Sequence, residues 1–386
     1  MIHIDVVLGT RPEITKSAQI VQALIQETDV NVQIFMTGQH TEIASAALND
    51  LGIAELCKEK WLSGRPKGPY EPDWYSNASN SLRQTLSRER PNIVIVIGDT
   101  LSALLGAYVA SESKIPVFHV EAGIRLKKPT DLDIEDSIRR KISKYAFFHF
   151  TPTPREKSNL LAEGIQGNQI SVVGDLSIGS CSLTYERIPL SIKSATTFRE
   201  AIANLGITQT HLITLDDINE WNNGFVLSTL HRRSSLEYQD RLESWIRNLI
   251  HEIQIPIFIL CSRPDTRWER FYRSLQSESR FRLIKHLSPT QFQLFLKYAS
   301  CVITDSAGVQ QESLLLGKGV IAMRSEVDLY ENHKQLRIVS PPFNRVTNEH
   351  AKMCRQNASW EPPKKNWRDF GLRVAKNIIN KIQKGG

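Results

Sequence analysis

Short apolar runs that alternate with stretches of helical periodicity are the feature that most constrains the fold of this chain. Residues 93–97 are almost wholly aliphatic and stop at Gly98, residues 101–111 have the small-residue pattern of a buried helix, and residues 117–120 form a second apolar run. Short apolar runs that alternate with helical stretches are typical of βα units and parallel sheets. The same alternation recurs in both halves of the chain, which predicts a doubly wound α/β fold.

The length of the chain predicts more than one domain. At 386 residues it is too long for a single core. Strands are predicted near residues 3–8, 32–37, 93–97, 117–120, 147–151 and 170–173, and again near 225–229, 255–260, 282–285, 301–304 and 319–323. We therefore expect two Rossmann-like domains at 1–175 and 224–365, a linker with an irregular lead into the second domain at 176–223, and a final helix at 366–386 that could pack on the N-terminal domain.

The composition of the chain indicates which class of ligand it binds and in which cellular compartment we expect it. A formal net charge of +7 is a mild bias that suits anionic ligands such as phosphates, and no basic tract interleaved with aromatic residues points to nucleic acid. The five cysteines are scattered and lack metal-binding spacing, which predicts reduced thiols. The N-terminus runs directly into a predicted strand and no apolar run has the length of a membrane span, so we expect a cytoplasmic protein.

Carboxylates stand at the ends of two neighbouring predicted strands. Asp99 follows the strand at 93–97, and Glu121 follows the strand at 117–120. Ligands of doubly wound sheets bind at the carboxyl ends of strands, and burial there pushes the pKa values of carboxyl groups apart, as a proton-transfer pair requires. A third acidic position, Glu135, adds weight to this interpretation. The alternative for each residue alone is a helix cap, which suits Asp99 well.

The first predicted strand ends in a glycine turn, Gly9-Thr10-Arg11, and a helix start. Gly9 would allow a ligand to approach the backbone, Arg11 could bind a phosphate, and Lys16 lies one turn further along the predicted helix. The alternative is an ordinary βα turn with a solvated arginine.

A second strand-to-helix junction spans residues 304–312. The free N–H groups and the dipole at such a helix start bind phosphate, and Ser306 could cap the helix and add a hydroxyl group. Glu312 lies about two turns into the helix, where a carboxylate could bind the two hydroxyls of a ribose. A simple helix cap is the alternative.

Further polar side chains follow other predicted strands. His231 and Arg232 follow the strand at 225–229 and suit a diphosphate leaving group, or else form a basic surface turn. Gln39 and His40 follow the second strand, and we expect both to contact the substrate, although His40 could only cap a helix. Arg139 lies on a predicted helix, and one basic side chain of that helix could face the site.

Taken together, these stretches resemble the UDP-N-acetylglucosamine 2-epimerase family. The motifs that carry the resemblance cover most of the chain and are GTRPEITK, TGQH, GDT, HVEAGIR, VVGD, TLHRR and TDSAGVQQESLLLGK. Each is weak alone, but so many in this order are specific. The resemblance implies the GT-B architecture, in which two Rossmann-like domains hold the site in the interdomain cleft.

The resemblance also implies a mechanism. The non-hydrolysing branch eliminates UDP across carbons 1 and 2 of the sugar and adds it back after a proton returns to the opposite face of carbon 2. By motif, Asp99, Glu121 and Glu135 become the acid/base candidates and His231 the leaving-group contact. UDP would be held by Arg11, Lys16, Arg139, Ser306, Gly308 and Glu312. Such a mechanism requires no metal and no nicotinamide cofactor; its partner is a UDP-linked sugar, and homodimers are common among similar enzymes.

Three departures from the family pattern leave alternatives open. Residues 134–144 look more like the hydrolysing branch, and Ala307 stands where the non-hydrolysing branch usually has glycine. In the loop 324–331, Leu329 replaces an arginine of the family pattern and only Glu331 is kept. A GT-B glycosyltransferase, a hydrolase of the nucleotide sugar, and a non-catalytic nucleotide-sugar binding protein are therefore the competing hypotheses.

Overall fold

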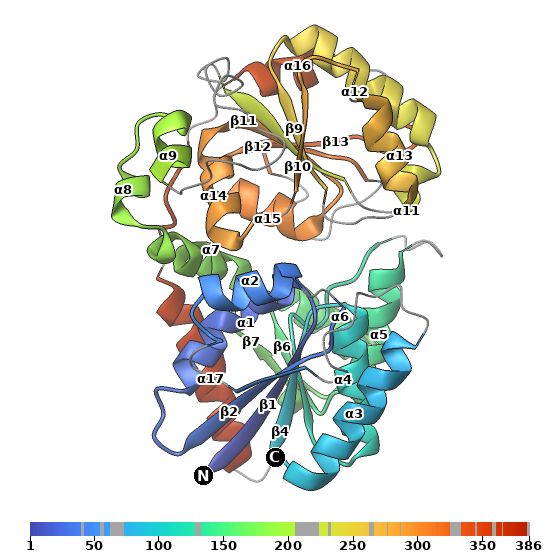
Figure 1. Cartoon of the computed structure of the whole chain (residues 1–386). Helices are drawn as coiled ribbons and strands as arrows, with labels where there is room; N and C mark the ends of the chain where they lie inside the picture. The colour runs from blue at the N-terminus through green and yellow to red at the C-terminus, as the bar shows by residue number, and fades with distance from the viewer. Residues whose placement is uncertain are drawn as a thin grey trace. The chain divides into compact units, whose positions relative to one another are not determined.

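The protein folds into two compact units, which Figure 1 shows in a computed structural model. Unit 1 comprises Met1–Leu183 and Lys364–Gly386, and unit 2 comprises Thr184–Pro363. The structure describes residues 1–39, 42–54, 58–61, 73–127, 133–204, 224–230, 233–261, 266–275, 277–285, 287–324, 333–343, 346–356, 360–364 and 366–383.

Unit 1 is built on a seven-stranded sheet whose strands are all parallel. Its members are β1 (Ile2–Leu8), β2 (Val30–Met36), β3 (Lys58–Trp61), β4 (Ile93–Ile97), β5 (Val117–Val120), β6 (Phe148–Thr151) and β7 (Ile170–Val172). Their order is β3-β2-β1-β4-β5-β6-β7, so the direction of winding reverses between β1 and β4. In open α/β sheets, ligands bind outside the carboxyl ends of the strands at this reversal.

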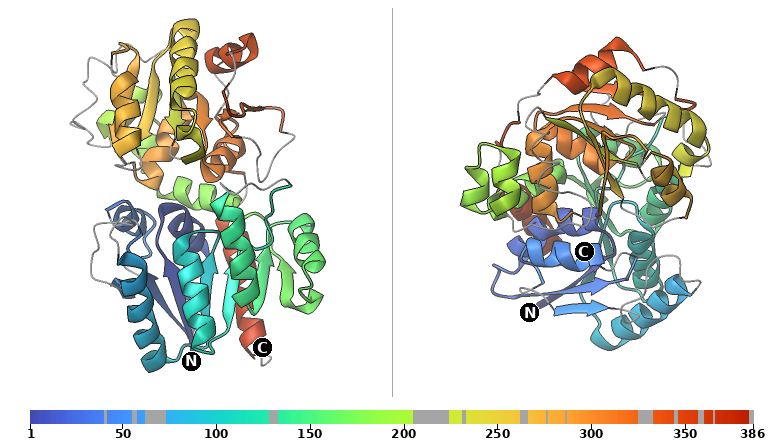
Figure 2. Two further views of the ribbon diagram at one scale, coloured as in Figure 1. Left: turned by 90° about the vertical axis from the view of Figure 1, so that its right-hand side faces the viewer. Right: turned by 45° about the horizontal axis from the view of Figure 1, so that its top comes forward.

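Helices cover both faces of this sheet. One face carries α1 (Arg11–Leu24), α2 (Glu42–Asp50) and α17 (Trp367–Gln383), and the other carries α3 (Trp74–Glu89), α4 (Leu101–Glu112) and α5 (Ile134–Tyr145). Side chains of β1 alternate between the faces: Ile4 and Val6 pack with α1 and α17, whereas Val7 packs with α3 and α4. In the left view of Figure 2, α3, α4 and α5 lie in front of the strands.

Unit 2 repeats this plan with a six-stranded parallel sheet. Its strands are β8 (Phe225–Thr229), β9 (Ile257–Cys261), β10 (Phe281–Lys285), β11 (Ala299–Thr304), β12 (Gly319–Ala322) and β13 (Leu336–Ile338), in the order β10-β9-β8-β11-β12-β13. Winding reverses between β8 and β11. Val226 packs with the face of α12 (Gln239–Ile253), α13 (Thr266–Leu275) and α16 (Asn348–Arg355), whereas the ring of Phe225 lies 5.9 Å from that of Phe295 on α14 (Pro289–Tyr298).

The predicted fold class, two parallel α/β units of the Rossmann-like type, is confirmed. Sequence patterns missed β3, a polar segment, and β13, which has three residues. Residues 176–223, expected as a linker, contain α7 (Leu176–Arg187), α8 (Leu190–Lys193) and α9 (Phe198–Asn204) among the part that is described. The final helix, α17, packs against α1 of unit 1. Within the described ranges, the structure contains no helix of sufficient length and hydropathy to cross a membrane.

Candidate active site

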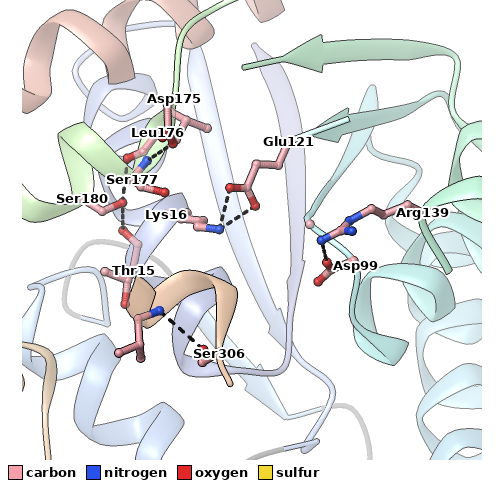
Figure 3. A network of polar contacts seen from close by, with 12 residues as sticks. Thr15, Lys16, Asp99, Glu121, Arg139, Asp175, Leu176, Ser177, Ser180 and Ser306 are labelled. Carbon is pink, nitrogen blue, oxygen red and sulfur yellow. Dashed lines mark hydrogen bonds and ion pairs between the residues drawn. The ribbon is translucent and has the colours of Figure 1, made fainter. Parts of the chain in front are cut away.

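A buried ion pair lies at the carboxyl ends of the strands of unit 1. Lys16, in the second turn of α1, donates from Nζ to both carboxylate oxygens of Glu121 at 2.6 and 2.7 Å. Glu121 directly follows β5, and the two side chains are only 15% and 7% exposed (Figure 3). The pair brings the end of β5 and the start of α1 to one point.

Two further carboxylates shift the pKa values of this pair through their negative charge. Burial lowers the pKa of Lys16, but the charge and the hydrogen bonds of Glu121 raise it more, and Asp99 and Asp175 act in the same direction. Burial raises the pKa of Glu121; Lys16 opposes this shift, whereas Asp175 and Asp99 add to it. The net result is a carboxylate that holds a proton more tightly than an ordinary glutamate, which makes it a stronger base.

The backbone of Glu121 is itself unusual. Its φ of 65° lies in the left-handed region, which costs a residue other than glycine about 1–3 kcal/mol. Two residues on, Gly123 has φ of 80°, and a Cβ there would lie 2.4 Å from the carbonyl oxygen of Glu156. The chain therefore turns sharply as it leaves β5, and this turn places the Glu121 carboxylate beside Lys16. Strain of this kind is frequent at functional sites.

Asp99, at the end of β4, forms an ion pair with Arg139 of α5 (Figure 3). Asp99 is 25% exposed and Arg139 is 7% exposed. Glu135 is half-buried in the first turn of α5, one turn before Arg139 and on the same helix face. The structure thus brings together Asp99, Arg139 and the helix of Glu135, and it gives Lys16 and Arg139, both expected to hold UDP, a carboxylate partner within unit 1.

Sequence reasoning gave no role to Asp175, which follows β7 and is the last residue of the VVGD motif. This residue is 7% exposed, its Oδ1 accepts a hydrogen bond from the backbone N–H of Ser177 at 2.8 Å, and it shifts the pKa of both Lys16 and Glu121. The preceding Gly174 has φ of 96°. A strand end followed by Gly-Asp is the same signal that identified Asp99, so the sequence contained the information.

The start of α1 is occupied by Glu13. Its Oε2 accepts hydrogen bonds from the N–H groups of Gly9 and Thr10 at 3.0 and 2.7 Å, and its Oε1 accepts one from the hydroxyl of Thr100 at 2.5 Å. Burial raises the pKa of Glu13 to about 7, although these hydrogen bonds oppose the shift. The two backbone N–H groups that lead into this helix are therefore bound by the protein's own carboxyl group.

Gly9 was expected to let a ligand approach the backbone, and protein atoms fill the side on which a Cβ would lie. A Cβ on residue 9 would lie 1.9 Å from Oγ of Ser102 and 2.5 Å from Oγ1 of Thr37. Gln39, expected as a substrate contact, is buried and accepts hydrogen bonds from the Ser102 N–H and hydroxyl at 3.1 and 2.7 Å. These contacts join the end of β2 to the start of α4.

In unit 2, α15 (Ala307–Leu315) starts directly after β11 and is capped by Ser306. The Ser306 hydroxyl accepts from the N–H of Val309 at 3.5 Å, and the Ser306 N–H donates to Oγ1 of Thr304 at 2.9 Å. A Cβ added to Gly308 would meet no atom within 4 Å, and Glu312 is half-buried further along the helix. The helix start has the geometry expected for an anion site.

Several residues that were predicted to belong to the site are not part of the geometry described above. His40, His231, Arg232, Leu329 and Glu331 lie outside the described residues. Arg11 is the first residue of α1 and is half-buried, and Ala307 is the first residue of α15.

Comparison with known proteins identifies the family. The chain matches the family model described as UDP-N-acetylglucosamine 2-epimerase over residues 22–383. A UDP-N-acetylglucosamine 2-epimerase of Methanocaldococcus jannaschii is 29% identical over 340 residues, 84% of each chain, and one of Campylobacter jejuni is 28% identical over 390 residues, 98% of this chain and 97% of the relative. The structure of the Neisseria meningitidis UDP-GlcNAc 2-epimerase bound to UDP-GlcNAc superimposes with a TM-score of 0.80 at 23% identity and covers 100% of both chains. The chain belongs to the UDP-N-acetylglucosamine 2-epimerase family.

Proposed function

We propose that this enzyme inverts carbon 2 of UDP-N-acetylglucosamine by eliminating UDP and adding it back. The observation that carries the mechanism is the buried Lys16–Glu121 pair at the end of β5, held on a left-handed backbone and surrounded by further carboxylates. Relatives of the same family carry the name of this activity, and the structure from Neisseria meningitidis holds UDP-GlcNAc.

Glu121 is the proton acceptor in this proposal. As the carbon-2 proton leaves to the carboxylate, the bond between carbon 1 and the UDP oxygen breaks and a carbon–carbon double bond forms between carbons 1 and 2. The raised pKa of Glu121 matches the need for a strong base, and Lys16 keeps its carboxylate charged and oriented. Lys16 is thus assigned to Glu121 rather than to UDP.

Asp99 is the second proton-transfer group. Inversion requires a proton to return on the face opposite to the one it left, so one carboxyl group is not enough. Asp99 follows β4, the strand that pairs with β5, and its partner Arg139 fixes the orientation of the carboxylate. Glu135, one turn from Arg139, is the remaining acid/base candidate.

Unit 2 supplies the nucleotide contacts. The start of α15 offers N–H groups and the Ser306 hydroxyl to a diphosphate, the open side of Gly308 admits a bulky anion, and Glu312 would bind ribose hydroxyls. His231 and Arg232, which follow β8, complete the proposed diphosphate contacts of unit 2, and Arg11 of unit 1 remains a separate candidate.

The test is proton NMR of the purified enzyme with UDP-N-acetylglucosamine in heavy water. We expect deuterium at carbon 2 and a mixture of the two epimeric UDP-sugars, because the returning proton comes from a carboxyl group that exchanges with solvent. Free N-acetylmannosamine with UDP would instead identify the hydrolysing reaction. A reaction that requires an acceptor would identify glycosyl transfer, and either outcome would contradict the proposal.

A further inference from the structure

A second cluster of potential ligands lies at the amino end of the unit 1 sheet, away from the strand ends described above. His3 and Asp5 belong to β1 and are two residues apart, so they face the same side of the sheet. The next residue on that side, Val7, packs in the cluster that contains Leu82 and Leu86 of α3. Glu89, the last residue of α3, reaches the same point.

The three side chains are close enough to share one ion. A ligand atom from each of His3, Asp5 and Glu89 lies within 4.8 Å of the others, and Nε2 of His3 is 3.0 Å from Oδ1 of Asp5. Asp5 is 0% exposed, whereas His3 is 20% and Glu89 is 16% exposed. A buried carboxylate requires a cation or a metal ion close by, and the two half-buried side chains leave a path for an ion to enter.

Gln33 provides an independent observation at the same place. It pairs with Asp5 in the parallel register of β1 and β2, and it is 7% exposed. Its amide nitrogen lies 2.6 Å from Nε2 of His3, and among the described residues its Oε1 has no hydrogen-bond partner. Nε2 of His3 cannot both donate to Asp5 and accept from Gln33. A half-turn of the amide places Oε1 at this point instead, where the oxygen joins the nitrogen and the carboxylates as a fourth donor.

We propose that His3, Asp5, Glu89 and Gln33 bind one divalent transition-metal ion of the zinc class. One imidazole nitrogen with carboxylate and amide oxygens suits Zn²⁺ and its first-row neighbours, whereas Mg²⁺ and Ca²⁺ prefer oxygen donors alone. The ion ties β1, β2 and α3 together, so its role is structural. It takes no part in the sugar chemistry, which uses the opposite ends of the strands.

The surroundings hold the ligands in position before an ion binds. The backbone N–H of His3 donates to Oδ1 of Asn92 at 2.7 Å, and the N–H of Asn92 donates to the carbonyl of His3 at 2.8 Å. Arg88 contacts Oε1 of Glu89 at 3.0 Å. Such outer contacts orient metal ligands and raise affinity.

The test is calorimetric titration of the full-length protein with Zn²⁺ after treatment with a chelator and desalting. We expect one high-affinity ion per chain, a higher melting temperature with Zn²⁺, and no comparable effect of Mg²⁺. His3→Gln and Glu89→Gln should each weaken Zn²⁺ binding at least about tenfold. The matched control is His251→Gln, which removes an exposed histidine 3.9 Å from Glu278 and should leave binding unchanged.

Cobalt substitution in the unaltered protein gives a readout that does not depend on a variant folding. The visible spectrum of bound Co²⁺ should show nitrogen and oxygen ligands without a thiolate charge-transfer band. A thiolate band, equal Zn²⁺ binding by all variants, or no binding by the unaltered protein would overturn the proposal and leave His3 and Asp5 as an ion pair.

Discussion

The helices α1 and α15 both start beside the point where the strand order of their sheet reverses, yet the groups bound at the two starts differ. In α1, Glu13 accepts hydrogen bonds from the N–H groups of Gly9 and Thr10, and a Cβ on residue 9 has no room. In α15, a serine hydroxyl is the cap and the space beside Gly308 is open. Position in the fold marks both helix starts as ligand sites, but the cap decides which of them can accept an anion.

The same contrast extends to the groups that surround each helix. The strand ends of unit 1 carry acids with cationic partners, Lys16 with Glu121 and Arg139 with Asp99. At the described end of β11, Thr304 is bonded to Thr229 at 2.6 Å, and the buried Asp305 accepts a hydrogen bond from the Ser235 hydroxyl at 3.1 Å. We infer that unit 1 moves protons and that unit 2 binds the nucleotide, a division that substitutions can separate.

The largest expected effect is that of Glu121→Gln. Removing the base should lower kcat about 10²–10⁴-fold, because the amide cannot accept the carbon-2 proton. UDP binding measured by calorimetry should stay within a few-fold of normal. Glu112→Gln, an exposed change at the far end of α4, is the control. Normal turnover of UDP-N-acetylglucosamine by Glu121→Gln would remove the chemistry from unit 1.

Lys16→Met should act through Glu121. Breaking a buried pair by removing one partner costs about 3–5 kcal/mol of unfolding free energy. Lys16 lowers the pKa of Glu121, so without it that pKa rises further and the acid limb of the kcat–pH profile moves to higher pH. Urea unfolding and the pH–rate profile measure the two effects, with the exposed Lys144→Met as control. A loss of UDP affinity with an unshifted profile would place Lys16 on the nucleotide instead.

The raised pKa of Glu13 predicts that the free energy of unfolding depends on pH. Its pKa is about 7 in the folded protein and about 4.5 in the unfolded chain, so the folded state binds more protons between these values. Its contribution, up to about 3 kcal/mol, is therefore present below pH 4.5 and is lost as the pH rises through 7. Urea unfolding of Glu13→Gln should lack this decline.

The difference between Glu13→Gln and the unaltered protein isolates this group. Burial lowers the pKa of His119 to about 3 and that of His149 to about 4, which gives both histidines a stability term that increases with pH. Their contributions cancel in the difference. Equal pH slopes for the two proteins would mean that Glu13 stays ionised.

The sequence predicted the fold wherever apolar runs are continuous. All residues of β4 and β5 are buried, and both strands were predicted at their observed bounds. The edge strands β3 and β13 lack such runs, because an edge strand needs less burial. His119, inside the apolar run of β5, is fully buried with Nε2 2.8 Å from the carbonyl oxygen of Gly98.

The site was predictable in position but not in pairing. Asp99 and Glu121 were found because residues after parallel strands meet at one edge of the sheet. Their partners come from α1 and α5, and the spacing of residues along a chain does not determine which helix residue meets which strand end. The left-handed backbone of Glu121 has no local sequence signal, because that region is the usual place of glycine.

The smallest expected effects test the two helix starts directly, with the same substitution in each. Gly9→Ala should lower the unfolding free energy by about 1–3 kcal/mol, since its Cβ would collide with Ser102 and Thr37. Gly308→Ala meets no atom within 4 Å and replaces a poor helix former, so stability should stay equal or rise by up to about 1 kcal/mol.

The two substitutions should rank the other way round in their effect on nucleotide binding. The methyl group of Gly308→Ala occupies the open side of the α15 start and should weaken UDP binding several-fold, as calorimetry can measure. Gly9→Ala, assayed well below its melting temperature, should bind UDP normally, because the α1 start is already filled by Glu13. If Gly9→Ala weakened UDP binding and Gly308→Ala did not, the anion site would belong to α1, and the protein's own carboxyl group would have to leave that helix start when UDP binds.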